Sequence, residues 1–320
     1  MIDDMTRPDL VVFGEVAVDI ILAGVDQIPR RWSVLGRVEA ARVLTAGTAG
    51  YVAQCFLKLG GHAAVAGKIG DDSVGRLLLE DLRRLRVSTS NVLVDRKADT
   101  EVSTVIVYRD GNKASVVTEI LPLKLSEFNV HKLIRSSAFH FAGYLFYPNL
   151  WRRDAPNLFK TAKKKGVLVS ADPQMSATGQ WSKPFQRILP NLELLLLDEE
   201  EAKKVSRRKR IPEAIKHLLK KGTGTVAVKM GAKGCMIGAA DELFSVPGFR
   251  AESVSTIGAG DAFDAAFIYG LLHKWNLRRT AEFANVVGAI STTEYGCMTA
   301  IPKARVVERI RERYYGRSAG

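Results

Sequence analysis

The sequence predicts an α/β protein with a mostly parallel β-sheet covered by helices on both faces and a small β lid. Short apolar runs typical of buried strands alternate with segments of helical length along most of the 320 residues. Two regions of looser alternation do not fit this order, and we expect them to form the lid. No low-complexity linker or internal repeat divides the chain, so we expect one domain over residues 1–320.

The strands of the sheet are predicted from short apolar runs. The first run, Leu10–Gly14, ends in a glycine that begins a turn. Similar runs follow, and the later ones are each separated by a helical segment: Ala63–Gly67, Ala138–Phe141, Val167–Ala171, Leu192–Leu197 and Thr225–Lys229. Strands separated by helices form parallel sheets, because each connection must return to the same edge.

Two early helices are predicted from apolar residues at helical spacing. The first covers Gly50–Leu59 and is followed by Gly60 and Gly61, which act as a carboxy-terminal stop. The second covers Val74–Leu85 and is amphipathic, with an apolar face assigned to Leu77, Leu78, Leu82 and Leu85.

The lid is expected over residues of about 15–44 and 102–117. The first segment alternates loosely and is broken at Gly24, Pro29 and Gly36. The second has the sequence of a hairpin, because the alternating runs Val102–Val107 and Ala114–Val117 flank the turn Arg109–Asn112.

The composition excludes several classes of protein. No apolar run approaches the roughly 20 residues that span a bilayer, and the amino terminus is short and acidic, so we expect a cytoplasmic protein without a membrane partner. Cys55, Cys235 and Cys297 are widely spaced, which favours reduced thiols over a zinc site. The net charge of +13 raises the question of nucleic acid. The basic runs 163–165 and 207–210 are more typical of solvated surface, so no nucleic-acid partner is expected.

The densest chemical signal is Ser255–Asp261, which precedes an apolar helix. Small residues before a helix leave backbone N–H groups free at the positive end of its dipole, so Gly258, Ala259 and Gly260 are predicted to form an anion hole. Asp261 is then placed to accept the proton of an attacking hydroxyl as a general base. The alternative is that Asp261 only caps the helix and the glycines only form a tight turn.

This segment resembles the signature DTTGAGDAF of the ribokinase-like (PfkB-type) carbohydrate and nucleoside kinases, matching Thr256 and residues 258–263. Gly67–Gly75 is similar to the family's G-x-x-G-x-D-x-x-G segment, and Ile301 with Pro302 closes a resemblance that covers nearly the whole chain. It implies an ATP-dependent kinase that phosphorylates a hydroxyl of a sugar, with a nucleoside as the alternative acceptor. It also implies Mg²⁺ as a cofactor and a homodimer, as in many relatives.

The resemblance implies an acceptor site near the amino terminus. Residues 46–53 stand in the place of the GGAxANVA turn that lines the sugar pocket, where Gly47 matches while Ala46 and Tyr51 replace a glycine and an asparagine. Asp19 matches the aspartate that binds sugar hydroxyls, and the alternative for it is an ordinary loop carboxylate.

The resemblance also implies a nucleotide site in the second half of the chain. Asp198 and Glu201 stand in the place of N-x-x-E and would hold Mg²⁺, although an acidic helix start explains them as well. The remaining residues implied for the nucleotide are Lys229, Gly231 and Gly234 near its phosphates and ribose, Thr256, and Asn285 near its base.

A ligand-binding or regulatory protein on the kinase fold is the alternative from another class, because Tyr51, Asp198 and Ser255 depart from the family pattern. Asp261 and its anion hole are both present, which favours the enzyme.

Overall fold

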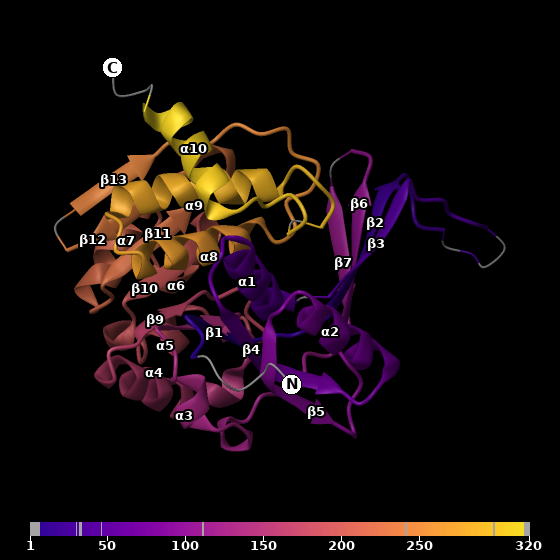
Figure 1. Cartoon of the computed structure of the whole chain (residues 1–320), viewed down its shortest axis with the longest axis horizontal. Helices are drawn as coiled ribbons and strands as arrows, with labels where there is room; N and C mark the ends of the chain where they lie inside the picture. The colour runs from indigo at the N-terminus through magenta and orange to yellow at the C-terminus, as the bar shows by residue number, and fades with distance from the viewer. Residues whose placement is uncertain are drawn as a thin grey trace.

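A nine-stranded sheet forms the centre of the molecule, and a four-stranded sheet stands off its edge (Figure 1). The computed structural model describes residues 7–29, 31, 34–45, 47–110, 112–240, 242–296 and 298–316. Ala46 and Cys297 lie outside these ranges. The nine strands, in spatial order, are β13 (Glu242–Val246), β12 (Cys235–Ala239), β11 (Thr225–Lys229), β10 (Leu194–Asp198), β9 (Leu168–Ala171), β8 (Ala138–Ala142), β1 (Leu10–Gly14), β4 (Ala63–Gly70) and β5 (Ser88–Asp95).

The order of the strands places a crevice beside β1. Every pair from β11 to β5 is parallel, whereas β12 and β13 are added antiparallel at one end. The chain builds outward from β1 through β4 to β5, and later returns to build the other side from β8. The strand order reverses between β1 and β8, so the loops that follow these two strands leave in opposite directions. A crevice is expected between these loops, at the carboxyl ends of the strands.

Helices cover both faces of the large sheet. One face carries α1 (Gly47–Lys58), α2 (Ser73–Arg84), α8 (Ala259–Leu272), α9 (Leu277–Ser291) and α10 (Ala304–Tyr315). The other carries α3 (Val130–Leu133), α4 (Asp154–Lys164), α5 (Ser182–Phe185), α6 (Glu199–Ser206) and α7 (Ile211–Lys220). Short 3₁₀ turns occur at Leu125–Glu127, Tyr144–Phe146, Pro148–Leu150, Leu189–Asn191 and Gly231–Lys233. The predicted α/β architecture is confirmed.

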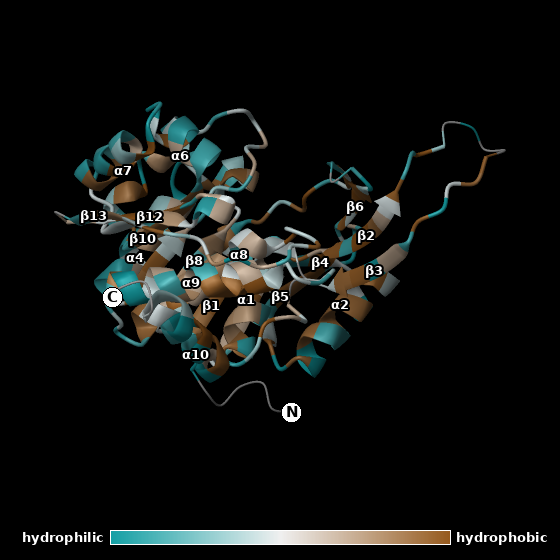
Figure 2. Cartoon of the chain, turned by 90° about the horizontal axis from the view of Figure 1, so that it is seen from above, coloured by the Kyte–Doolittle hydropathy of each residue, from teal (hydrophilic) through white to brown (hydrophobic). Residues whose placement is uncertain are grey.

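Each buried strand contributes to two cores. In β10, Leu194 and Leu196 pack into the core beneath α8 and α9, whereas Leu195 and Leu197 pack into the core beneath α6 and α7. Successive side chains of a strand point to opposite faces, so a strand covered on both sides is apolar throughout. Figure 2 shows this as hydrophobic strands inside helices whose outer faces are hydrophilic.

Several predicted details are wrong. Strands β5, β12 and β13 were not predicted. The edge strands β5 and β13 mix polar and apolar residues, whereas β12 follows β11 after a short turn and lacks the helix that separates the predicted strands. Leu77 is 43% exposed rather than part of the buried face of α2, where Leu78 and Leu82 are buried. Helix α2 lies over the outer strands β4 and β5, so the sheet covers only one narrow stripe of it.

The four-stranded sheet has the order β3 (Ala40–Thr45), β2 (Val18–Val25), β6 (Val102–Tyr108) and β7 (Lys113–Val117). The predicted hairpin is present, because β6 and β7 pair antiparallel. One face turns toward the body, where Ile21, Ala23 and Val107 are buried with Ile257 beside them. The small sheet projects from the body beside α2, with this face turned toward the loop before α8 (Figures 1 and 2).

No helix within the described ranges is long and apolar enough to cross a membrane. Cys55 and Cys235 are both buried free thiols, as the sequence predicts for them.

Candidate active site

The candidate site lies at the carboxyl ends of the parallel strands. The segments that follow β1, β8, β9, β10 and β11 all begin at this edge. The first turn of α8 lies over it. Parallel strands place the loops that follow them side by side, so residues distant in the sequence share one crevice. The predicted residues after β1, β10 and β11 and those of α8 therefore lie along the same edge.

The loop before α8 has the form expected of an anion hole. Gly258 is the N-cap residue at φ 72°, a left-handed conformation that favours glycine, and no side chain caps the helix. The N–H groups of the first turn point outward at the positive end of the helix dipole. Asp261 lies inside this first turn, so the alternative that Asp261 caps the helix is wrong.

Asp261 is a buried carboxylate among other carboxylates. Burial raises its pKa well above the usual range, and the charges of Asp172, Asp264 and Glu15 raise it further, while Lys229 lowers it. The Gln174 amide donates to Oδ1 of Asp261 at 3.3 Å and to Oδ2 of Asp172 at 3.1 Å. A raised pKa makes the ionised carboxylate a stronger proton acceptor.

Lys229 is paired beneath the anion-hole loop. Its Nζ donates to both carboxylate oxygens of Asp264, at 2.9 and 3.0 Å, and Asp264 is fully buried. A Cβ added at Gly260 would lie 3.3 Å from this Nζ, so the ammonium group sits directly against the loop. The positive charge of Lys229, which the sequence resemblance assigned to the nucleotide phosphates, is therefore already paired with the Asp264 carboxylate.

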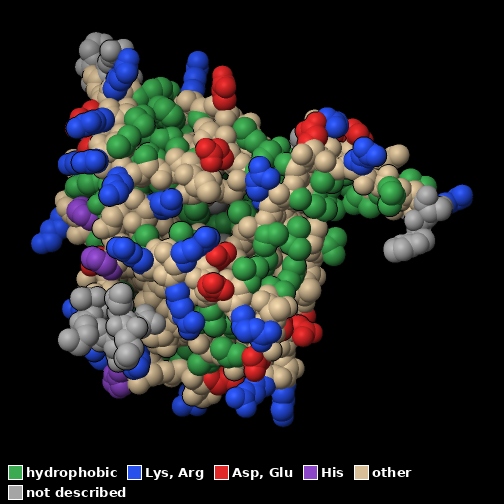
Figure 3. Space-filling view, turned by 45° about the vertical axis from the view of Figure 1, so that its right-hand side comes forward, with side chains coloured by type: hydrophobic (Ala, Val, Ile, Leu, Met, Phe, Trp, Pro, Cys, Tyr) green, Lys and Arg blue, Asp and Glu red, His purple; other side chains and the backbone are tan. Residues whose placement is uncertain are grey.

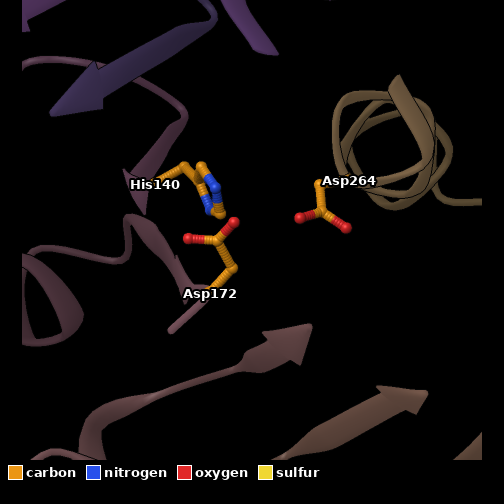
Figure 4. A group of neighbouring side chains, drawn as sticks. All are labelled: His140, Asp172 and Asp264. Atoms are coloured by element: carbon orange, nitrogen blue, oxygen red, sulfur yellow. The ribbon is translucent and has the colours of Figure 1, made fainter. Parts of the chain in front are cut away.

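His140, Asp172 and Asp264 bring metal-ligating atoms within 4.8 Å of one another (Figure 4). His140 and Asp172 extend from the neighbouring strands β8 and β9, and Asp264 faces them from α8. Burial lowers the pKa of His140 to about 4, and its Nδ1 contacts Ser170 Oγ at 3.0 Å, so the imidazole is neutral. The Lys229 ammonium group supplies a positive charge beside these carboxylates. This favours an ion-pair network over a metal site at His140, Asp172 and Asp264.

The acceptor residues predicted from the sequence lie where β2 meets α1. The Tyr51 hydroxyl donates to Oδ2 of Asp19 at 2.6 Å, and both side chains are buried. Gly47 begins α1 at φ 64°, and a Cβ there would lie 2.6 Å from the Ala17 backbone nitrogen. Glycine therefore lets the start of α1 pack against the segment after β1.

Two further carboxylates stand beside Asp19. Glu15 Oε2 accepts from the backbone N–H of Thr48 at 3.0 Å, near the amino end of α1. Burial raises the pKa of Glu101, and the adjoining carboxylates of Glu15 and Asp19 raise it further. Glu101 Oε1 is buried and has no hydrogen-bond partner among the described residues.

The predicted metal residues form a capping box at the start of α6. Asp198 Oδ1 accepts from the Glu201 N–H at 2.7 Å, and Glu201 Oε2 accepts from the Asp198 N–H at 2.7 Å. Both the helix-start alternative and a metal role remain compatible with this geometry, since each carboxylate keeps a second oxygen. Burial raises the pKa of Glu201 to about 8.

The other predicted nucleotide residues surround the same edge. Gly231 and Gly234 form the turn between β11 and β12. Asn285 on α9 donates to the carbonyls of Val246 and Pro247, at 3.4 and 3.1 Å. Thr256 is exposed in the loop before α8 and accepts a contact from Lys113 of β7, which joins the small sheet to this loop.

Sequence reasoning missed Glu101, Asp264 and the bridging role of Gln174. Asp264 follows Asp261 by three residues, and this helical spacing places both on one face, which was a usable signal. Glu101 immediately precedes an apolar strand, and nothing local indicates that it is buried.

The comparisons with known proteins show the family and the fold of the chain. Residues 7–304 match the family model described as pfkB family carbohydrate kinase. Fructokinase-1 of Zea mays is 28% identical over 324 residues, covering 95% of this chain and 98% of the relative.

Two solved structures are similar in fold. The Arabidopsis thaliana ribokinase complexed with ribose and ATP has a TM-score of 0.81 at 20% identity, covering 96% of this chain and 99% of that one. An Escherichia coli structure in complex with ATP and Mg²⁺ has a TM-score of 0.83 at 21% identity, covering 96% of this chain and 100% of that one.

Asp19 generates a prediction for stability. Burial raises its pKa from 3.8 to about 6, so the native state binds more protons than the unfolded state in this range. Native stability from this group therefore falls as pH rises from 3.8 through about 6, by up to about 3 kcal/mol. In Asp19→Asn this loss should vanish.

The measurement is urea unfolding of both proteins at about pH 4 and about pH 7. The exposed Asp99→Asn variant, from the same loop as Glu101, is the control. Equal pH dependence of stability in the parent and Asp19→Asn proteins would show that Asp19 is not desolvated.

Proposed function

The chain belongs to the pfkB family of carbohydrate kinases, and we propose that it transfers the γ-phosphoryl group of ATP to a sugar hydroxyl with Asp261 as the general base. The observation that carries the proposal is the position of Asp261. It is buried in the first turn of α8, directly after the anion-hole loop, and Glu15 of the acceptor side is close enough to raise its pKa. One carboxylate therefore lies between the two substrate sides.

The proposed step is an in-line displacement. The acceptor hydroxyl oxygen forms a bond to the γ-phosphorus as the bond to the β-phosphate oxygen breaks, and the hydroxyl proton passes to Asp261. ADP leaves with the bridging oxygen. The N–H groups of Gly258, Ala259 and Gly260 stabilise charge on the transferring oxygens, with the dipole of α8 behind them.

Asp198 and Glu201 fit a hydrated Mg²⁺, because each keeps one carboxylate oxygen after forming the capping box. The ion would neutralise charge on the nucleotide phosphates. We assign Lys229, Gly231, Gly234, Thr256 and Asn285 to the nucleotide side, with Lys229 acting through Asp264 and Asp261 as well as through its own charge.

We assign Asp19, Gly47 and Tyr51 to the acceptor side. The four-stranded sheet serves as a lid over them, and the contact between Lys113 and Thr256 supports this role because it closes the crevice at the anion hole. A closed lid excludes water and suppresses hydrolysis of ATP. A cytoplasmic location and the absence of a nucleic-acid partner stay predictions, and salt-dependent DNA binding would contradict the second.

Asp261→Asn should lower kcat about 10²-fold or more, since the amide cannot accept the proton, while ATP affinity changes little. The assay is ATP consumption with a panel of hexoses, pentoses and nucleosides, followed by ATP titration. Asp71→Asn, an exposed aspartate after β4, is the control. Near-normal turnover of Asp261→Asn would refute the assignment, and binding of a sugar without turnover by the parent would indicate a non-catalytic protein.

Lys229→Met should lower kcat about tenfold or more near neutral pH and move the acidic limb of the pH profile to higher pH. The reason is that Lys229 lowers the pKa of Asp261, so its loss leaves less of the base ionised. Lys229→Arg keeps the charge and should restore most activity. Lys216→Met, at an exposed lysine on α7, is the control. A raised KM for ATP with an unmoved pH profile would show that Lys229 acts only on the nucleotide.

We also propose a homodimer that pairs two lids. The outer face of the lid contains one row of paired residues, Val43, Ile20, Thr104 and Val116, in which Val43 and Val116 are 57% and 67% exposed. Hydrophobic side chains are visible over this part of the surface in Figure 3. A second copy would cover these side chains and the sheet edges.

Sedimentation at micromolar concentration should give twice the 35.1 kDa mass of the chain. The double substitution Val43→Lys and Val116→Lys should give the monomer, because two buried charges oppose pairing. Val306→Lys on α10 is the control. A monomeric parent protein would contradict the pairing but not the lid.

A further inference from the structure

Three carboxylates meet where the lid joins the body. Glu15 follows β1, Asp19 lies in β2, and Glu101 immediately precedes β6, whose start pairs with β2. The Val18 N–H donates to the Glu101 carbonyl at 3.0 Å, which fixes this juxtaposition. Asp19 and Glu101 are 8% and 3% exposed. The cluster lies on the acceptor side of the site, since the charge of Glu15 acts on Asp261.

Structural roles account for only part of this cluster. Glu15 caps the start of α1 through Thr48, and Asp19 accepts from Tyr51. Glu101 Oε1 is buried and has no hydrogen-bond partner among the described residues. The Thr48 hydroxyl is likewise buried without a partner in the described ranges. Buried polar atoms in native proteins nearly always have a partner, so an unpaired oxygen beside a substrate site indicates a group supplied by the ligand.

The charge of the cluster identifies that group. Among the described residues, no Lys or Arg side chain forms an ion pair with Glu15, Asp19 or Glu101. Burial raises the pKa of Glu101 and of Asp19, and the neighbouring carboxylates raise it further because like charges destabilise one another's ionised forms. A neutral hydroxyl adds no charge, and an anionic sugar would add charge of the wrong sign. A ligand ammonium group supplies both hydrogen-bond donors and the missing positive charge.

We propose that the acceptor of this kinase is an amino sugar, whose positively charged amino group binds Glu101 and Asp19 while one of its hydroxyls faces Asp261. This inference rests on the proposed function and specifies its substrate class. The raised pKa of Glu101 keeps a proton on its carboxyl group, and binding of the ammonium group releases that proton to solvent. Binding is therefore linked to proton release as well as to charge.

The test compares matched sugars that differ at one nitrogen. The parent protein is assayed with glucose, glucosamine, N-acetylglucosamine and gluconate, and with fructose and 1-amino-1-deoxyfructose. In at least one pair, kcat/KM for the amino sugar should exceed that for the neutral sugar about tenfold or more, the scale of one buried hydrogen bond to a charged group. N-acetylation should abolish the advantage, and gluconate should be the poorest substrate.

Glu101→Gln should reduce the ratio of amino to neutral sugar about tenfold, because the amide keeps the shape and removes the charge. Glu80→Gln, an exposed glutamate on α2, is the control and should leave the ratio unchanged. The heat of binding of the amino sugar should also depend on the ionisation enthalpy of the buffer, which reports the released proton. The ratio in the parent protein needs no variant, so a misfolded Glu101→Gln does not weaken the test.

Turnover of neutral sugars that equals or exceeds that of their amino counterparts would overturn this inference and leave the proposed function standing. An unchanged ratio in a folded Glu101→Gln protein would overturn the role of Glu101. If no sugar of either kind is phosphorylated, both the inference and the proposed function fail.

Discussion

The placement of β1 between β4 and β8 is the constraint on which the site depends. Parallel hydrogen bonding on both sides of β1 makes it the point where the chain changes direction across the sheet. The loops that leave neighbouring strands therefore open a crevice at one edge. Helix α8 packs against α1 and α9, and its amino end is thereby held over the same edge. The proposed acceptor side after β1 and the proposed anion-binding loop before α8 meet because of this single topological choice.

Charge balance is the second theme of the site. Asp172, Asp261 and Asp264 are buried near one cation, Lys229, and Glu15, Asp19 and Glu101 form a second acidic group without one among the described residues. Burial alone favours the neutral forms of all these groups. The protein accepts this cost at the site that we propose for the nucleotide phosphates, a metal ion and the acceptor. In the proposed function, the substrates supply the charges that balance these carboxylates.

The four-stranded sheet, our proposed lid, links the two sides of the proposed site. Its inner face packs Ile21 and Val107 near Ile257, which directly precedes the anion-hole glycines. Its first strand carries Asp19, and its last strand carries the lysine that contacts Thr256. A movement of this sheet would alter the acceptor pocket and the anion hole together, because both are attached to the same four strands.

The sequence by itself determined the alternation of strands and helices, the hairpin 102–117 and the glycine loop before α8, because these follow from local periodicity and turn chemistry. It also determined the family, through motifs in a fixed order. Only the tertiary structure decided that Lys229 pairs with Asp264, that Gln174 bridges Asp172 and Asp261, and that Glu101 lies beside Glu15. Local rules reach about one helical turn along the chain, whereas these contacts join residues that only the order of strands brings together.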